Sequence, residues 1–209
     1  MMKLLNLAAA GITTVLLATG ANAATLTADL GLDFFDSGAG PLAGPYGGDI
    51  VGGGFPVALA DTSNALDGDL NTFVSLPTGS FITVGFSGGF VFDGPGDDIF
   101  VTEVGGNPDE DADVFVSTDG MAFSFLGTVG TGGTETLDLA TIGFTAPVNA
   151  VRVLGLGTGG GSPGYDLSLL QGLAGSVVTT TPVPLPAGGL LLLGALGVLG
   201  VVRRKQSKS

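Results

Sequence analysis

The sequence contains no cysteine, no histidine and no tryptophan. The absence of cysteine excludes disulfides, thiolate nucleophiles and zinc–thiolate sites. The absence of histidine excludes the usual general base, the serine–histidine–aspartate arrangement and imidazole metal ligands. A domain without disulfides needs another source of stability, and a bound calcium ion is the one that we expect.

Basic residues are scarce, and acidic residues are concentrated in the middle of the chain. All 19 acidic residues lie between Asp29 and Asp166, and Arg152 is the one basic residue among them. The net charge is −13. A surface of this sign repels nucleic acid and anionic lipid and attracts divalent cations, so we expect no nucleic-acid partner.

Glycine and proline are abundant, with 39 and 11 copies in 209 residues, while 44% of the residues are hydrophobic. That length accommodates one domain of ordinary size with appendages. Because the middle of the chain carries regular valine, isoleucine and phenylalanine, we predict a folded, turn-rich β domain there rather than disorder.

The first 23 residues have the pattern of a cleaved secretory signal. Lys3 provides the positive start, an apolar stretch follows, and Ala21 and Ala23 form a small-x-small cleavage site. We therefore predict a signal peptide over residues 1–23 and a mature chain that starts near Ala24. An uncleaved anchor or a buried helix is the alternative.

The C-terminal stretch combines two prolines, an uncharged apolar run and a basic cluster. Residues 187–202 carry no charge and would span about 24 Å as a helix, somewhat short of a hydrocarbon core of about 30 Å. Pro184 and Pro186 favour extended backbone before this run. Arg203, Arg204 and Lys205 then predict a stop that stays on the cytoplasmic side of the membrane.

This tail, with the motif Val183, Pro184, Leu185, Pro186 and Ala187 followed by the helix and the basic cluster, resembles the PEP-CTERM class of sorting signals in its VPLPA-CTERM form. The resemblance covers residues 183–205. It implies export through the inner membrane, recognition by an exosortase-type protease, and delivery to the cell surface or extracellular matrix of a Gram-negative bacterium. A permanent inner-membrane anchor remains the alternative.

Residues 24–176 alternate in hydrophobicity with a period of two, and glycine-rich turns interrupt the pattern. Strands are expected at residues 81–86, 98–104, 113–119, 123–129, 150–156 and 165–173. No amphipathic helix separates them, so we predict an all-β, antiparallel jelly-roll or β-sandwich ectodomain. Residues 177–182 are then a linker. Residues 24–55 give only a weak strand signal.

Three stretches of this domain resemble galactose-binding-like, discoidin-type β-sandwiches. They are ALDGDLNTF at 65–73, VFVSTDGMAFSFLGTV at 114–129 and AVRVLGL at 150–156. The Asp-Gly pair of the second stretch independently predicts a hairpin turn. The resemblance implies a structural calcium in the DGDLNT loop, held by Asp67, Asp69 and Thr72, with Asp166 as the last ligand.

The last ligand departs from the pattern of that class, because the acidic residue of the last strand usually comes later, where this chain has Gln171. Oxygen ligands at alternating positions suit calcium, and Gly68 permits a tight turn between them. A solvated, aspartate-rich turn is the alternative.

Other charged and aromatic residues receive less specific interpretations. DGPGDD at 93–98 and NPDEDAD at 107–113 are interpreted as solvated loops, with a second, weak cation site as the alternative. Arg152 either contacts a ligand or pairs with a neighbouring acid. Most of the 13 phenylalanines are expected in the core.

Three classes of function follow from these patterns. An exported, non-catalytic surface or matrix protein that binds calcium and exopolysaccharide fits best. An anchored periplasmic carbohydrate-binding module is the alternative. A glycoside hydrolase fits least, because no pair of carboxyl groups is marked by its spacing or by an apolar surrounding.

Overall fold

The computed structural model describes residues 25–105, 109–130 and 132–180. The predicted signal peptide (1–23), the sorting motif (183–187), the helix (187–202) and the basic stop (203–205) lie outside the described residues and remain predictions. Within the described ranges, none of the helices has the length and apolar character needed to cross a bilayer.

The described chain forms a seven-stranded, a five-stranded and a two-stranded sheet, all antiparallel. In order across the seven-stranded sheet lie β11 (Gly133–Leu137), β8 (Ile99–Glu103), β13 (Tyr165–Gly172), β5 (Thr72–Leu76), β3 (Tyr46–Asp49) and β4 (Val57–Ala58), with β1 (Leu26–Thr27) also paired to β13. The five-stranded sheet contains β10 (Ser124–Val129), β9 (Ala112–Ser117), β12 (Ala150–Gly155), β6 (Phe81–Gly85) and β2 (Leu30–Phe35). The third sheet pairs β14 (Val177–Thr179) with β7 (Gly89–Val91).

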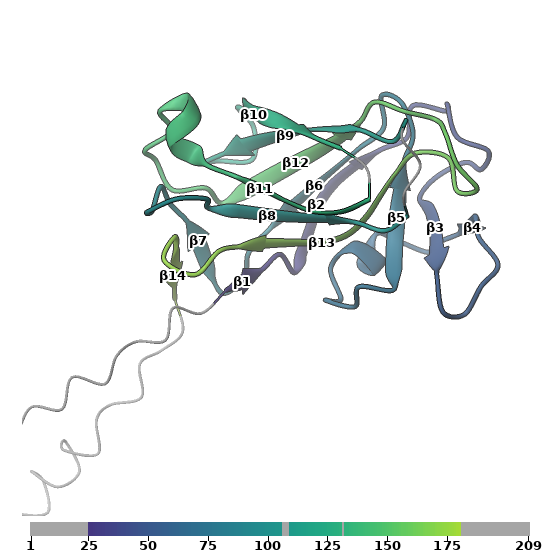
Figure 1. Cartoon of the computed structure of the whole chain (residues 1–209), viewed down its shortest axis with the longest axis horizontal. Coiled ribbons are helices and arrows are strands. Elements are labelled where there is room, and N and C mark those ends of the chain that lie inside the picture. Colours follow the sequence, from purple (N-terminus) through teal and green to yellow (C-terminus); the bar gives the residue numbers. More distant parts are fainter. Residues whose placement is uncertain (1–24, 106–108, 131, 181–209) are drawn as a thin grey trace, which may run out of the picture.

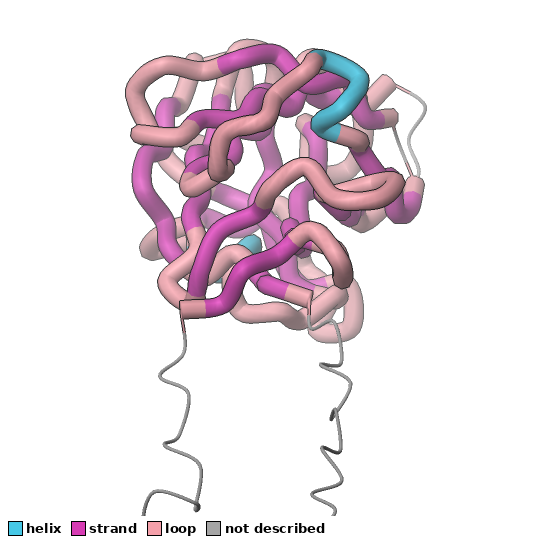
Figure 2. Tube along the Cα trace, turned by 90° about the vertical axis from the view of Figure 1, so that its left-hand side faces the viewer, coloured by secondary structure: helices cyan, strands magenta, loops and turns pink. Residues whose placement is uncertain are grey.

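The two larger sheets form the layers of a β-sandwich (Figure 1). Strands and loops make up nearly all of the described chain, as Figure 2 shows. The helical content of these residues is two short 3₁₀ turns, η1 (Ser63–Ala65) and η2 (Leu139–Ile142). The prediction of an all-β, antiparallel sandwich is therefore confirmed.

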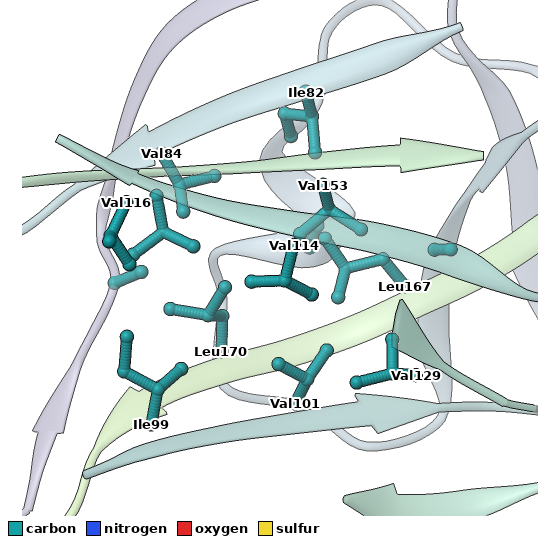
Figure 3. Close-up of a cluster of buried hydrophobic side chains, with 14 of the residues drawn as sticks. Ile82, Val84, Ile99, Val101, Val114, Val116, Val129, Val153, Leu167 and Leu170 are labelled. Atoms are coloured by element: carbon teal, nitrogen blue, oxygen red, sulfur yellow. The ribbon is translucent and has the colours of Figure 1, made fainter. Parts of the chain in front are cut away.

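The core between the layers is built mainly from aliphatic side chains (Figure 3). In β12, Val151 and Val153 are fully buried, whereas Arg152 between them is partly exposed. The same alternation in β9 buries Val114 and Val116 and leaves Phe115 partly exposed. Because successive side chains of a strand point to opposite faces, one alternating pattern fills the core and furnishes the outer surface.

The phenylalanines do not fill the core as expected. Only Phe73 and Phe86 are buried among the 13, all of which lie in the described residues. Phe35 stacks on Phe81, and Phe115 packs edge-on against Phe125, both pairs on the outer face of the five-stranded sheet. The expectation of a phenylalanine core is wrong because valine and leucine occupy the inward positions of these strands.

Six expected strands appear as β6, β8, β9, β10, β12 and β13. Strands β5 and β11 were not expected, and the stretch with a weak strand signal contains β1, β2 and β3. Residues 177–182, predicted as a linker, contain β14, which pairs with β7. The boundary of the domain is corrected accordingly, and the domain extends at least to Thr179.

The predicted Asp-Gly turn joins β9 and β10. Gly120 has a φ of 74°, a conformation that glycine adopts without strain. One carboxylate oxygen of Asp119 accepts hydrogen bonds from the backbone N–H groups of Met121 and Ala122. The Asp-Gly pair thus builds the hairpin turn that the sequence predicts, in a connection longer than two residues.

The first and last described strands lie at the same end of the sandwich. Strands β1 and β14 both contact β7 at that end, while β3, β4 and β5 lie at the other end (Figure 1). The loops beyond β3, β8 and β12 are therefore far from the points where the described chain begins and stops.

Candidate functional site

Three buried carboxylates meet at the end of the sandwich opposite β1 and β14. Glu103 is the last residue of β8, Asp166 is the second residue of β13, and Glu110 lies in the segment before β9. Their exposed fractions are only 3%, 6% and 2%. One carboxylate oxygen from each lies within 4.8 Å of the other two. This acidic cluster gathers three carboxyl groups where little water reaches them.

Strand pairing places two members of the cluster. In the register of the seven-stranded sheet, Glu103 lies opposite Leu167, and the Val104 N–H donates to the Asp166 carbonyl at 2.9 Å. On the other side of β13, Asp166 lies opposite Ser75 of β5. Glu103 and Asp166 are therefore neighbours because β13 pairs with both β8 and β5.

A glycine-rich loop between β12 and β13 positions Glu110. A Cβ atom at Gly157 would lie 1.7 Å from the carbonyl oxygen of Asp109 and 3.2 Å from the Cα of Glu110. The Leu156 N–H also donates to the Asp111 carbonyl at 2.9 Å. Since only glycine fits at this distance, the GLGTGGG stretch packs directly against the backbone that carries Glu110.

The oxygens of the cluster are unequally hydrogen-bonded. Ser75 donates to Asp166 Oδ1 at 2.5 Å and lies 2.6 Å from the Ser162 hydroxyl. The Gly132 N–H donates to Glu103 Oε2 at 2.5 Å. Glu103 Oε1 is buried and has no hydrogen-bond partner within the part of the chain that the structure describes. Burying a carboxylate oxygen without a hydrogen bond destabilises the folded protein.

Burial disfavours ionisation of the cluster. It raises the pKa of Asp166 to about 8, with further contributions from the negative charges of Glu110 and Glu103. Burial also raises the pKa of Glu103, although the N–H groups of Gly132 and Gly133 partly offset this effect. The cluster therefore favours either a bound proton or a bound cation.

Both tyrosines of the chain lie beside the cluster. Tyr46 is buried, its hydroxyl donates to the Pro163 carbonyl, and burial together with the charge of Asp166 raises its pKa. Tyr165 is also buried, and burial together with the charge of Glu103 raises its pKa. The acidic cluster thus lies within electrostatic reach of both phenol rings.

A pocket of about 170 Å³ opens above the cluster. Its polar side is formed by Glu110, Asp166 and Ser162, and its apolar side includes Phe55 and Phe73. Phe55 is 43% exposed, and its ring packs edge-on against Phe73 with 5.7 Å between centroids. The lining of the pocket therefore combines a solvent-accessible aromatic ring with hydrogen-bonding residues.

The predicted calcium loop forms a separate group of oxygens. The Thr72 hydroxyl lies 2.9 and 3.1 Å from the two carboxylate oxygens of Asp67, 3.2 Å from the Asn64 carbonyl and 3.3 Å from the Asp69 carbonyl. A hydroxyl has one proton to share among these four oxygens. Gly68, with a φ of 76°, makes the tight turn between the two aspartates. These converging oxygens fit the ligand chemistry of calcium.

Asp166 does not join that loop. It pairs in register with Ser75, which lies three residues beyond Thr72 along β5, or about 10 Å at the rise of a strand. Its carboxylate belongs instead to the cluster with Glu103 and Glu110. The predicted ligand set is corrected at this position. The Asp69 side chain is also turned to its own loop, where it accepts from the Asn71 N–H and side-chain amide.

Arg152 pairs with an acid, the second of its two interpretations. Its guanidinium lies 3.4 Å from Asp33 and donates to the Thr83 hydroxyl at 2.9 Å. It also lies over the rings of Phe81 and Phe123, at 3.9 and 4.2 Å from their centroids. Arg152 therefore belongs to the outer face of the five-stranded sheet and does not line the pocket.

Sequence reasoning missed Glu103, Glu110 and Phe55. Glu110 belongs to the NPDEDAD stretch, which was interpreted as solvated, but it is buried; Asp98 of DGPGDD is buried as well. Glu103 lies near the end of the apolar stretch DIFVTEV. This position in an apolar stretch is the one feature of the sequence that indicates burial of Glu103. Nothing in the sequence marks Phe55, because its place depends on the loop after β3.

Comparison with known proteins gives structural matches only. No family model matches the chain, and no curated protein does. Among solved structures it is similar to the CBM32 of AlyQ in complex with 4,5-unsaturated mannuronic acid, with 11% identity, 68% of this chain and 98% of that chain covered, and a TM-score of 0.40.

Two further solved structures are similar to a comparable degree. For CBM32-3 from a family 31 glycoside hydrolase of Clostridium perfringens, the identity is 14%, 56% of this chain and 85% of that chain are covered, and the TM-score is 0.42. For the C-terminal domain of a chitobiase from Bacteroides fragilis, the identity is 17%, 70% of this chain and 99% of that chain are covered, and the TM-score is 0.42. Overlaps of this size do not decide the family of the chain, so its function has to come from its own residues.

The raised pKa of Asp166 predicts how stability depends on pH when EDTA keeps divalent cations away. Unfolded Asp166 loses its proton near pH 3.8 and folded Asp166 near pH 8. Between these values the unfolded state binds fewer protons, so stability falls with rising pH, by at most about 1.4 kcal/mol per pH unit. Thermal melts between pH 4 and 8 should show this fall, and Asp166→Asn should flatten it.

The matched control is Asp97→Asn, which changes an exposed aspartate of the same domain. This variant should retain the slope of the unmodified protein. If Asp166→Asn and Asp97→Asn give the same slope, burial of Asp166 does not control the pH dependence.

Proposed function

We propose that the chain is an exported, non-catalytic protein of the bacterial cell surface or extracellular matrix that binds carbohydrate in the pocket beside the acidic cluster. The pocket carries this proposal, because an exposed aromatic residue, Phe55, lines it together with the polar residues Glu110, Asp166 and Ser162. A sugar ring has an apolar face that packs on an aromatic side chain, and hydroxyl groups that donate to carboxylates. The resemblance of three stretches to galactose-binding-like domains supports the same activity.

The proposed destination is the one implied by the VPLPA motif at residues 183–187. An exosortase-type protease would recognise the tail after export, and residues 187–202 would hold the chain in the inner membrane during transit. The position of β14 supports this arrangement, since it lies at the end of the sandwich opposite the pocket (Figure 1). A chain held by its C-terminal side would therefore present the pocket away from the membrane.

The proposed cofactor is a structural calcium ion in the DGDLNT loop. Asp67, Asp69 and Thr72, with the carbonyl oxygen of Asn64, supply the oxygens. The positive charge of the ion would attract these oxygens more strongly than the one hydroxyl proton of Thr72 does. The ion would thereby stabilise the loop next to β5. This role suits an exported domain that has no disulfide.

Glycoside hydrolysis is the second candidate, because a glycosidase needs two carboxyl groups and raises the pKa of one of them. Asp166 has such a raised pKa. However, the three carboxylates are almost fully buried beneath the pocket rather than placed on either side of a cleft. Release of reducing sugar from a bound polysaccharide would favour this candidate over simple binding.

Carbohydrate binding is tested with polysaccharide purified from the native bacterium and with an oligosaccharide array that includes neutral sugars and uronic acids. Phe55→Ala should weaken binding about tenfold, because stacking on the ring contributes on the order of 1 kcal/mol. Phe125→Ala is the matched control, since that ring is similarly exposed but lies on the five-stranded sheet. Equal affinities of the two variants would contradict the assigned pocket.

Sorting is tested by the intact mass of the protein in membrane and extracellular fractions of its native bacterium. We expect an extracellular species that begins near Ala24 and ends near the VPLPA motif, because both ends are expected to be removed. A species that retains residues 203–209 in the inner membrane would instead indicate the permanently anchored alternative.

The loop calcium is tested by thermal melts in calcium and in EDTA. Saturating calcium should raise the melting temperature by roughly 5–10 °C, since an ion at one hundred times its Kd adds about 2.7 kcal/mol. Asp67→Asn should lose a large part of this increase, whereas Asp61→Asn, an exposed aspartate outside the loop, should keep it. An identical increase in both variants would contradict the loop site.

A further inference from the structure

We propose that Glu103, Glu110 and Asp166 hold a second divalent cation, of the size of calcium, at the floor of the pocket. The three residues come from β8, from the segment before β9 and from β13, so the fold brings together groups that lie far apart in the sequence. This cation site is distinct from the DGDLNT loop, with which it shares no residue.

The spacing of the oxygens fits one calcium ion. Calcium binds oxygen at about 2.4 Å, so two oxygens on the same ion lie at most about 4.8 Å apart. The three carboxylate oxygens lie within 4.8 Å of one another. Magnesium usually keeps several of its waters and is bound through one or two carboxylates, so a set of three buried carboxylates suits calcium better. An all-oxygen, carboxylate-rich set also favours a hard cation over zinc or copper.

In the part of the chain that the structure describes, the lack of nearby positive charge also favours the binding of a cation to the cluster. Arg152 is the one basic side chain among the described residues, and it is occupied by Asp33 and by two phenylalanine rings on the other sheet. Within the described ranges, no second basic side chain is therefore present to neutralise Glu103 and Asp166. Like charges at this separation repel strongly where water is excluded.

A second, independent observation points to a ligand. Glu103 Oε1 is buried and has no hydrogen-bond partner among the residues that the structure describes, although Oε2 of the same carboxylate is bonded to the Gly132 N–H. A Cβ atom built on Gly105 would lie 2.9 Å from Glu103 Oε1 and 3.7 Å from Glu110 Oε2. These two oxygens therefore lie on the same side of Gly105, and Oε1 is directed into the cluster.

The other acidic group of the described chain lacks this feature. Asp93, Asp98 and Asp138 also bring oxygens within 4.8 Å of one another. Asp98, however, accepts from the Gly94 and Leu139 N–H groups, and Asp138 caps η2 by accepting from the Ala140 N–H. Backbone donors account for the buried carboxylate there, so that group is explained without an ion.

The cation would have an open side toward the pocket. Calcium takes six to eight oxygens, and one oxygen from each of the three carboxylates leaves coordination positions unfilled. Glu110, Asp166 and Ser162 also line the pocket, so those positions face the space where a ligand enters. Vicinal hydroxyl groups or a carboxylate of a sugar would complete the coordination; this step rests on the proposed carbohydrate binding.

Terbium luminescence tests the cation site directly on the full-length purified protein. Terbium replaces calcium and emits when a nearby aromatic ring is excited, and the two tyrosines of this chain, which has no tryptophan, both lie beside the cluster. We expect tyrosine-sensitised emission that calcium displaces. Glu103→Gln should lower the terbium affinity at least about tenfold, whereas Asp61→Asn, an exposed aspartate outside both the cluster and the loop, should leave this emission unchanged.

Folding of the variant is controlled separately. The amide of Glu103→Gln keeps an acceptor for the Gly132 N–H and places a donor toward Glu110 and Asp166, so its melting temperature in EDTA should equal or exceed that of the unmodified protein. Emission that is absent, or that Glu103→Gln leaves unchanged, would overturn the site. Emission lost in Asp67→Asn and retained in Glu103→Gln would assign the ion to the loop and also overturn it.

Polysaccharide binding in calcium and in EDTA then separates the cation from the sugar. Binding that EDTA and Glu103→Gln both abolish supports coordination of the sugar by the ion. Binding that persists in EDTA overturns that coordination. Terbium binding that depends on Glu103, without affinity for any polysaccharide, supports the cation site and removes the proposed carbohydrate function.

Discussion

Strand β13 is the element on which the rest of the structure depends. It pairs with β5 on one side, with β8 on the other, and with β1 at its far end. Seven of its eight residues are buried, and they include the core residues Leu167 and Leu170. The same pairing that holds the seven-stranded sheet together also brings Asp166 beside Glu103. A shift of register would therefore disrupt both the core and the pocket.

The acidic cluster opposes the stability that this strand provides. Buried carboxylates are disfavoured, and a hydrophobic residue at any of the three positions would suit an isolated sandwich better. Groups that break the general rule of a dry, apolar interior are typically found at functional sites. The pocket lies above these residues, and both tyrosines of the chain lie beside them. The unfavourable burial of the carboxylates therefore occurs next to a pocket.

The sequence predicts the sandwich well because alternation of valine with polar residues is a local signal. It gives the limits of β6 and β12 to within a residue or two, and the Asp-Gly turn between β9 and β10. Strand β11 was missed because its sequence, GTETL, has the composition of a turn and gains its strand character from pairing with β8.

The candidate site was harder to predict, because it depends on contacts between distant segments. The DGDLNT loop is contiguous, and its Asp67 and Thr72 do lie together. Glu110 instead depends on a glycine that lies 47 residues later, Gly157, whose lack of a side chain lets two loops touch. The charge of Glu110 alone indicates an exposed position, so the burial of this residue cannot be derived from composition or from periodicity.

The place of β14 has a mechanical consequence. Any tension on the chain beyond residue 180 enters the domain through this three-residue strand, which pairs only with β7 in a sheet of its own. Such a short ladder would detach before the two large sheets, because its few hydrogen bonds carry the load first. We therefore expect β14 to separate from β7 under force while the two larger sheets, the core and the pocket remain folded.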